Sequence, residues 1–108
     1  MRKYAQYQKE KYNRKVVENE YGFICYNVYA DGSLYIQTLY VIPEARAEGK
    51  GKSLEQYVIE KEGPKVVFCK VDRRSNDWED VLRIIMGSGY SVYSESDTEF
   101  MLWKECNE

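Results

Sequence analysis

The sequence contains no histidine. This absence excludes Ser–His–Asp and Cys–His nucleophilic catalysis and every zinc site that uses an imidazole ligand. The three cysteines, at positions 25, 69 and 106, cannot all pair and lack the close spacing of metal-binding motifs. We therefore expect no metal site and interpret them as reduced thiols of a cytoplasmic protein. No apolar run approaches the roughly 18 residues that a membrane-spanning helix needs, so we expect no membrane partner.

What is present indicates one globular domain over residues 1–108, because 44% of the residues are hydrophobic and 31% are charged. The formal net charge is -2, with the basic residues concentrated at the start and the acidic residues at the end. Residues 1–15 hold six basic residues against one acid, and residues 94–108 hold five acids against one lysine. The basic segment would suit a nucleic acid or an acidic partner. We favour a solvated helix that complements the acidic end, since an acidic chain makes nucleic-acid binding unlikely as the main function.

Alternating and periodic patterns predict an α+β fold with a mixed sheet flanked by helices. The nearly continuous apolar run over 34–42 is typical of a strand buried on both faces, and Pro43 ends it. In the helix after it, the i, i+3, i+4, i+7 spacing predicts that Leu54, Tyr57, Val58 and Lys61 face the core. The predicted helices cover 3–13, 52–62 and 78–86, and the predicted strands cover 16–18, 23–29, 34–42, 65–71, 90–93 and 98–103.

The segment between the strand over 34–42 and the helix over 52–62 is the strongest candidate for a binding site. A helix N-terminus presents backbone N–H groups without intrahelical acceptors, and the helix dipole adds partial positive charge there. Gly49 and Gly51 leave the backbone accessible, while Lys50 and Lys52 add charge. Together they predict an anion cradle suited to a diphosphate. The alternative is an ordinary glycine-rich connection with a helix cap.

The run Leu39-Tyr40-Val41-Ile42-Pro43-Glu44-Ala45-Arg46-Ala47-Glu48-Gly49-Lys50-Gly51 resembles the acetyl-CoA motif of the GNAT N-acetyltransferases. That motif reads Arg/Gln-x-x-Gly-x-Gly/Ala after a strand end of the form L-Y-V-x-P-E. The resemblance extends over about residues 20–104 and includes Asn76 and Gly89-Tyr90. It implies a mostly antiparallel central sheet flanked by helices, with a shortened N-terminal part.

The resemblance also implies acetyl-CoA as the cofactor. The amides from Arg46 to Gly51 and the helix start would bind the pyrophosphate. The backbone of Val41 would pair with the pantetheine arm between two splayed strands, and the Leu39 amide would polarise the thioester carbonyl. The implied cofactor-binding residues are Leu39, Val41, Arg46, Ala47, Glu48, Gly49, Lys50, Gly51, Lys52, Ser53 and Asn76.

The catalytic residues are not identified by the resemblance. Family members often carry a glutamate where this sequence has Tyr35 and a tyrosine where it has Ile85. Tyr35, Tyr90 and Tyr93 are weak candidates to replace them, and core or sheet packing is the alternative for each. We expect an N-acetyltransferase that modifies a primary amine; the alternative is an inactive protein of the same fold that acts by binding.

About 20 residues precede Tyr21, whereas most family members place a strand and two helices there. The acceptor side is therefore expected to be open, which suits a lysine or an N-terminus on a protein better than an enclosed metabolite. Small acetyltransferases of phages that modify host proteins are of this kind, and such a protein would act in the host cytoplasm. A homodimer that completes the missing wall is the competing explanation.

Overall fold

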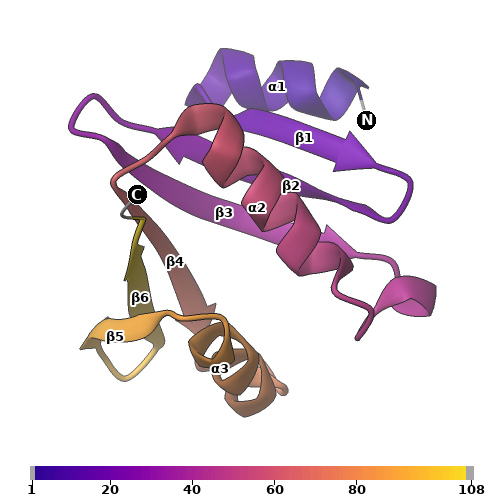
Figure 1. The fold of residues 1–108 in the computed structure, drawn as a ribbon. Coiled ribbons are helices and arrows are strands. Elements are labelled where there is room, and N and C mark those ends of the chain that lie inside the picture. The colour runs from indigo at the N-terminus through magenta and orange to yellow at the C-terminus, as the bar shows by residue number, and fades with distance from the viewer. Residues whose placement is uncertain (1, 107–108) are drawn as a thin grey trace.

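The computed structural model describes residues 2 to 106, so Glu108 of the acidic end lies outside them. Every helix and strand predicted from the sequence is present, with its ends shifted by at most two residues; an additional short 3-10 turn follows β3 (Figure 1). The elements are α1 (Arg2–Tyr12), β1 (Lys15–Asn19), β2 (Gly22–Val28), β3 (Ser33–Val41), η1 (Pro43–Ala45), α2 (Lys50–Glu62), β4 (Val66–Asp72), α3 (Trp78–Gly87), β5 (Ser91–Glu95) and β6 (Glu99–Glu105).

The six strands form one mixed sheet in the order β1-β2-β3-β4-β6-β5, which confirms the predicted fold class. All neighbours are antiparallel except β3 and β4, which are parallel. These two strands pair over only three positions, from Ser33↔Val66 to Tyr35↔Phe68. Residues 36–41 and 69–72 then diverge, so the sheet opens into a V between its two halves (Figure 1).

A β-bulge accompanies this divergence. Cys25 pairs with Thr38 and Tyr26 pairs with Ile36, which leaves Gln37 as the extra residue of β3. The Gln37 amide donates to Asn27 Oδ1 at 3.0 Å. Asn27 in turn donates to the backbone carbonyls of Tyr12 and Asn13, each at 3.3 Å. The end of α1 is therefore tied to the bulge through one buried asparagine.

The helices lie on opposite faces of the sheet. Ile24 and Tyr26 belong to the main core under α2 and α3, together with Leu54 and Val58 of α2. The alternate residues of β2 point to the other face, where Phe23 contacts Tyr4 of α1. The predicted apolar face of α3 packs against the same core through Trp78, Val81, Leu82 and Ile85.

Two burial predictions are wrong. The second half of β3 is not buried on both faces, because it has left β4: Leu39 is 42% exposed and Tyr40 is 40% exposed. On α2 the buried face is rotated by one position, so that Tyr57 is 54% exposed and Lys61 is also exposed. Glu55 is buried in their place, at 6% exposure.

The closest backbone approach at a glycine gives a prediction about stability. A Cβ on Gly22 would lie 1.9 Å from the carbonyl oxygen of Tyr40, whereas a Cβ on Gly87 would meet nothing within 4 Å. We expect Gly22→Ala to lower the free energy of unfolding by about 3 kcal/mol, because the backbones of β2 and β3 must separate. Gly87→Ala, in α3, should raise it by about 0.5 kcal/mol. Urea unfolding of both variants checks this, and equal effects would contradict it.

Candidate functional site

The loop between β3 and α2 is held in one conformation by its own backbone and by Arg46. Ala47 and Gly49 adopt left-handed conformations, with φ of 66° and 78°. The Arg46 Nε donates to the Val41 carbonyl at 3.0 Å, and the Arg46 amide donates to the Pro43 carbonyl at 3.3 Å. Arg46 therefore shapes the loop, and its amide is already used within it.

The six amides that follow, from Ala47 to Lys52, donate no hydrogen bond to any described residue. The first helical bond of α2 is the one from the Ser53 amide to the Gly49 carbonyl, at 3.0 Å. The Ser53 hydroxyl donates to the same carbonyl, so it does not cap these amides. A run of open amides at the positive end of a 13-residue helix is suited to bind an anion.

The two glycines of the loop have different surroundings. A Cβ on Gly49 would meet nothing within 4 Å, so the backbone there faces open space. A Cβ on Gly51 would touch the side chains of Val41 and Leu39 at 3.5 and 3.6 Å. Gly51 therefore lets the start of α2 lie close to the end of β3, and places the open amides beside that strand.

Strand β3 presents an unpaired backbone edge toward this helix start. The Ile42 amide donates to the Tyr21 carbonyl at 2.8 Å. In an antiparallel pair, alternate residues turn their backbone groups toward the partner strand. The backbone groups of Leu39 and Val41 consequently point away from β2, into the V between β3 and β4. The Val41 carbonyl is the one that accepts from Arg46.

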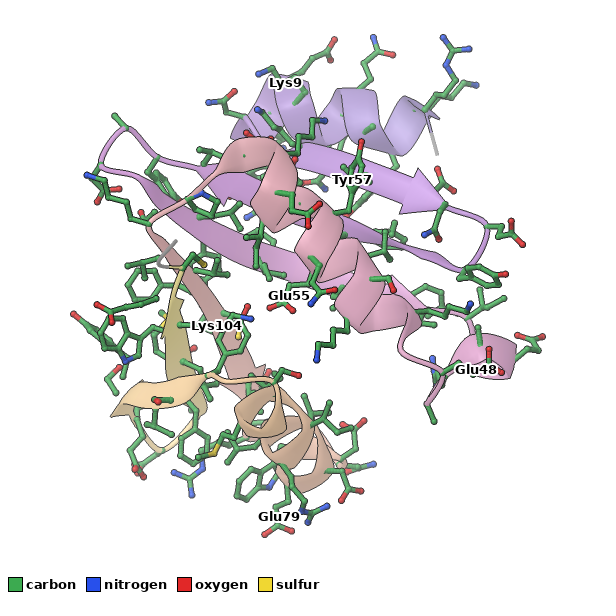
Figure 2. All side chains as sticks on the ribbon, in the orientation of Figure 1. Lys9, Glu48, Glu55, Tyr57, Glu79 and Lys104 are labelled. Carbon is green, nitrogen blue, oxygen red and sulfur yellow. The ribbon has the colours of Figure 1, made fainter. Side chains whose placement is uncertain are left out.

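The remaining predicted cofactor residues lie around this edge. Lys50 is turned aside, with its ammonium 4.1 Å from the centroid of the Tyr21 ring. Glu48 and Lys52 are exposed at the mouth of the loop (Figure 2 labels Glu48). Asn76 lies on an exposed turn between β4 and α3, so it comes from the other half of the sheet. Most of these residues are exposed, so the arrangement as a whole is an open surface.

The three tyrosines considered for catalysis are not brought together. Tyr90 is buried beneath α2, where its hydroxyl donates to Glu55 Oε2, and burial together with this carboxylate raises its pKa. Tyr35 points to the opposite face of the sheet, beside Lys70, and burial raises its pKa. Tyr93 is 62% exposed on the edge strand β5, on that same opposite face.

Two carboxylates that the sequence patterns missed hold α2 across the V. Glu62 accepts hydrogen bonds from the Tyr26 hydroxyl at 2.8 Å and from Lys15 at 3.1 Å, on the β1–β2 side. Glu55 accepts from the Tyr90 hydroxyl and from Lys104 at 3.1 Å, on the β5–β6 side (Figure 2). The seven-residue spacing of the two glutamates, beside Leu54 and Val58, was the available signal, because it places both on the inward face of the helix.

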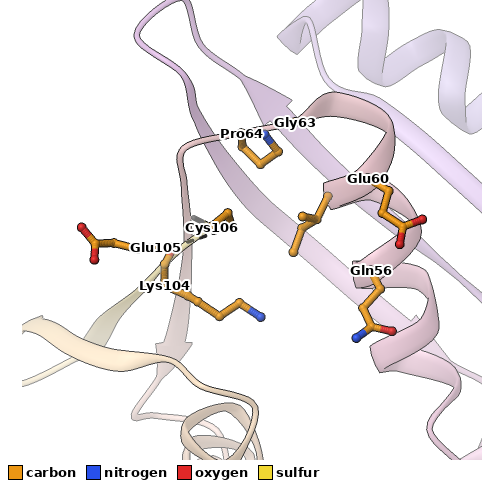
Figure 3. Close-up of a pocket in the computed structure, with 8 residues that line it drawn as sticks. Gln56, Glu60, Gly63, Pro64, Lys104, Glu105 and Cys106 are labelled. Carbon is orange, nitrogen blue, oxygen red and sulfur yellow. Dashed lines mark hydrogen bonds between the residues drawn. The ribbon is translucent and has the colours of Figure 1, made fainter. Parts of the chain in front are cut away.

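A cavity lies at the other end of α2 (Figure 3). It has a volume of about 710 Å³ and lies between the second half of α2 and the end of β6. In Figure 3 the side chain of Lys104 points toward α2, and that of Glu105 points away from the cavity. Its lining residues are Gln56, Ile59, Glu60, Gly63, Pro64, Lys104, Glu105 and Cys106.

Two further properties concern residues 2 to 106 as a whole. None of the helices there has the length and apolar character needed to cross a membrane. Nor does that part of the chain bring three or more Cys, Asp or Glu side chains together in a way that could hold a metal ion.

Comparison with solved structures identifies the fold. No family model matches the sequence, and no curated protein matches it. A GNAT-family protein from Desulfovibrio desulfuricans is similar in structure, with a TM-score of 0.67 at 18% identity over 82% of this chain and 65% of that one. PaiA N-acetyltransferase from Thermoplasma acidophilum, solved with coenzyme A, has a TM-score of 0.66 at 21% identity, over 80% of this chain and 54% of that one.

An acetyltransferase from Bacillus cereus ATCC 14579 matches over 96% of this chain and 90% of its own length, with a TM-score of 0.64 at 17% identity. The chain therefore spans about nine tenths of this structure but less than two thirds of the first two. These similarities show that the fold is that of the GNAT acetyltransferases.

The hydrogen bonds that Glu62 accepts from Tyr26 and Lys15 predict that the stability of the fold depends on pH. Burial alone would raise the pKa of Glu62, but the hydrogen bonds from Tyr26 and Lys15 outweigh it and hold the pKa below the ordinary value of 4.5. The ionised carboxylate therefore stabilises the fold fully above pH 4.5, and this contribution disappears as the pH falls through the lowered pKa of the native state. Glu62→Gln should lower the free energy of unfolding by about 1–2 kcal/mol near neutral pH.

The difference between Glu62→Gln and the wild type should narrow as the pH is lowered below 4.5 and through the lowered pKa of the native carboxyl. Urea unfolding at neutral pH and at the lowest pH at which the protein stays folded measures it. Glu60→Gln, an exposed change on the same helix, is the control and should have little effect at either pH. A difference that persists unchanged at low pH would contradict the assigned role of the carboxylate charge.

Proposed function

We propose that the protein binds acetyl-CoA and transfers the acetyl group to a primary amine of a protein. The observation that carries the proposal is that two sets of backbone groups without hydrogen-bond partners lie next to each other. The open amides of Ala47 to Lys52 lie beside the unpaired edge of β3 at Leu39 and Val41. A diphosphate joined to an extended chain that contains amide groups would satisfy both surfaces at once.

The proposal assigns each part of acetyl-CoA to a part of the candidate site. The pyrophosphate binds the amides from Ala47 to Lys52, and the exposed Lys52 adds positive charge, whereas Lys50 is turned toward the Tyr21 ring. The pantetheine arm lies in the V and pairs with the Val41 amide and the backbone groups of Leu39, since the Val41 carbonyl already accepts from Arg46. Asn76 approaches it from the other half of the sheet. The GNAT fold and the coenzyme A bound to the similar PaiA protein support this assignment.

The reaction requires a neutral amine at the thioester carbonyl and a proton for the departing thiolate. The amine attacks the carbonyl carbon, the C–S bond breaks, and coenzyme A leaves as the thiol. We assign to the Leu39 amide the stabilisation of the carbonyl oxygen as it becomes negative, the role that the resemblance implies for it. No carboxylate of β3 replaces the glutamate expected at position 35. Holding the two reactants together is therefore the main contribution that this site makes to the rate.

The acceptor is proposed to be a lysine or an N-terminus on a protein. The end of the V opens, beside Tyr35, onto the sheet face that carries α1, but α1 covers only the β1–β2 half of that face. Such a surface is accessible to a large substrate. The buried thiols of Cys25 and Cys69 fit a reducing compartment such as the cytoplasm. A host protein as the substrate of a phage enzyme remains a prediction.

A second candidate function is that of an inactive protein that binds through the same fold. The observation in its favour is that the Tyr90 hydroxyl donates to Glu55, and is thus engaged in anchoring α2. In this alternative acetyl-CoA binds but no transfer follows.

A matched pair of substitutions at Gly49 tests the binding of acetyl-CoA. Both Asp and Asn tolerate the left-handed conformation of Gly49, so they differ mainly in charge. We expect Gly49→Asp to raise the dissociation constant by about tenfold or more, because a carboxylate beside the open amides repels the diphosphate. Gly49→Asn should change it less than about threefold by the same reasoning. Isothermal titration calorimetry with acetyl-CoA checks both, and no heat with the wild type would refute the proposal.

Transfer is tested separately by mass spectrometry. Lysine-containing peptides and denatured cytoplasmic proteins are incubated with the protein and acetyl-CoA, with Gly49→Asp as the matched control. We expect acetylated amines with the wild type and a yield lowered by about tenfold with Gly49→Asp, because binding is lost. Binding without any acetylated product would favour the inactive alternative.

A further inference from the structure

One face of the β4–β6–β5 half of the sheet, opposite to the face that packs against α2 and α3, carries a cluster of large apolar side chains. The Tyr93 ring contacts those of Phe68 and Trp103 edge to face, with centroids 5.5 and 6.1 Å apart. Met101 lies on the same face of β6 as Trp103. We call Phe68, Tyr93, Met101 and Trp103 the open aromatic face. Tyr93 is 62% exposed, and Phe68, Met101 and Trp103 are half-buried. Because large apolar side chains that share one solvent-facing surface often mark a site of interaction, this face indicates a contact surface.

Carboxylates border this face. Side chains alternate along β6, so Glu99 and Glu105 point to the same side as Met101 and Trp103. Figure 3 shows Glu105 directed away from Lys104. Glu99 has one long ion pair, 3.6 Å from Lys70, and Glu105 forms no ion pair within the described chain. The open aromatic face is therefore rimmed by negative charge at both ends of β6.

The outer surface of α1 has the complementary character. Arg2, Lys3, Lys9 and Lys11 are exposed, and none of them forms an ion pair with residues 2 to 106 (Figure 2 labels Lys9). Tyr7 and Tyr12 are 48% and 43% exposed, and the Lys11 ammonium lies 5.8 Å from the centroid of each ring. Cations and aromatic rings are thus available on this helix for an acidic, aromatic partner surface.

These two surfaces cannot meet within one chain. Asn27 holds the end of α1 through the carbonyls of Tyr12 and Asn13. Gln8 of α1 is buried against Cys25 of β2. The helix is therefore fixed over the β1–β2 half of the sheet, whereas the open aromatic face belongs to the other half.

We propose that two copies of the chain form a two-fold symmetric dimer in which α1 of each packs on the open aromatic face of the other. A two-fold axis makes both contacts at once, because each copy offers the same pair of surfaces. The charges favour a second copy over an unrelated partner, since the cations that the glutamate rim requires are on this chain. Dimerisation as such needs no acetyl-CoA.

One consequence rests on the proposed function. Tyr35 and Lys70 border the open aromatic face where β3 leaves β4, next to the proposed end of the acetyl-CoA arm. The partner's helix would then form one wall of the acceptor site. The dimer is tested without acetyl-CoA, and the binding of acetyl-CoA is tested by the calorimetry described above. A failure of the dimer proposal can therefore be told apart from a failure of the proposed function.

Sedimentation equilibrium of the full chain at low and moderate salt measures the dimer. We expect the wild type to dimerise at micromolar concentration. Lys3→Glu/Lys9→Glu and Glu99→Lys/Glu105→Lys should each raise the dimer dissociation constant by at least about tenfold, because each places like charges against each other. Lys61→Glu and Glu79→Lys make the same kinds of change on exposed positions of α2 and α3, and should leave it unchanged. Circular dichroism and thermal unfolding verify that each variant is folded.

Mixing the two charge-reversed variants is the decisive experiment. In the proposed geometry, the acidic α1 of one variant meets the basic rim of the other, and the unaltered acidic rim of the first meets the unaltered basic α1 of the second. The mixture should therefore form heterodimers about as tight as the wild type. A wild type that stays monomeric, a dimer insensitive to both variants, or a mixture that stays monomeric would each overturn the proposal. Tyr93→Asp, at an exposed position in the centre of the face, should also prevent dimerisation.

Discussion

The short parallel contact between β3 and β4 is the constraint on which the rest of the structure depends. Three residue pairs join two halves of a sheet that are otherwise antiparallel. Because the bulge at Gln37 turns β3 away, the two halves would be free to rock about this contact if nothing else joined them. Helix α2 prevents this by crossing the V, with Glu62 hydrogen-bonded to Tyr26 on one side and Glu55 to Tyr90 on the other. Each glutamate also accepts from a lysine, so neither buried charge is left unpaired.

The same divergence leaves backbone groups without partners, and this is the origin of the candidate site. A fully paired β3–β4 ladder would have used the backbone edge of Leu39 and Val41, and the start of α2 would then have met an ordinary sheet. In this fold the unpaired edge and the open amides of residues 47–52 are neighbours because Gly51 allows close packing. The candidate site is thus made mainly of main-chain atoms, so its geometry does not depend on the side chains at positions 35 and 85, where the resemblance implies a glutamate and a tyrosine.

The helices, strands and loop of the candidate site could be predicted from the sequence because their signals are local. Pro43 follows the end of β3, Gly63-Pro64 follows the end of α2, and the residues of the anion-binding loop, 46–53, are consecutive in the sequence. Burial could not be predicted as well, because it depends on which strands pair. Leu39 and Tyr40 are apolar and were expected in the core, yet they border the V. Glu55 reads as a surface residue, and only the distant partners Tyr90 and Lys104 account for its burial.

The Gln37 side chain connects the proposed dimer to the proposed reaction. It donates to Asn27, and Asn27 holds the last carbonyls of α1, so the bulge that opens the V and the helix that would contact the partner share one buried network. A force on α1 from a second copy would act on the bulge through these three hydrogen bonds, because the buried Asn27 takes part in all of them. Dimerisation would then stiffen the end of the V where the thioester is proposed to lie. A site without a dedicated acid or base depends on the fixed placement of its reactants, so such stiffening would act directly on the rate.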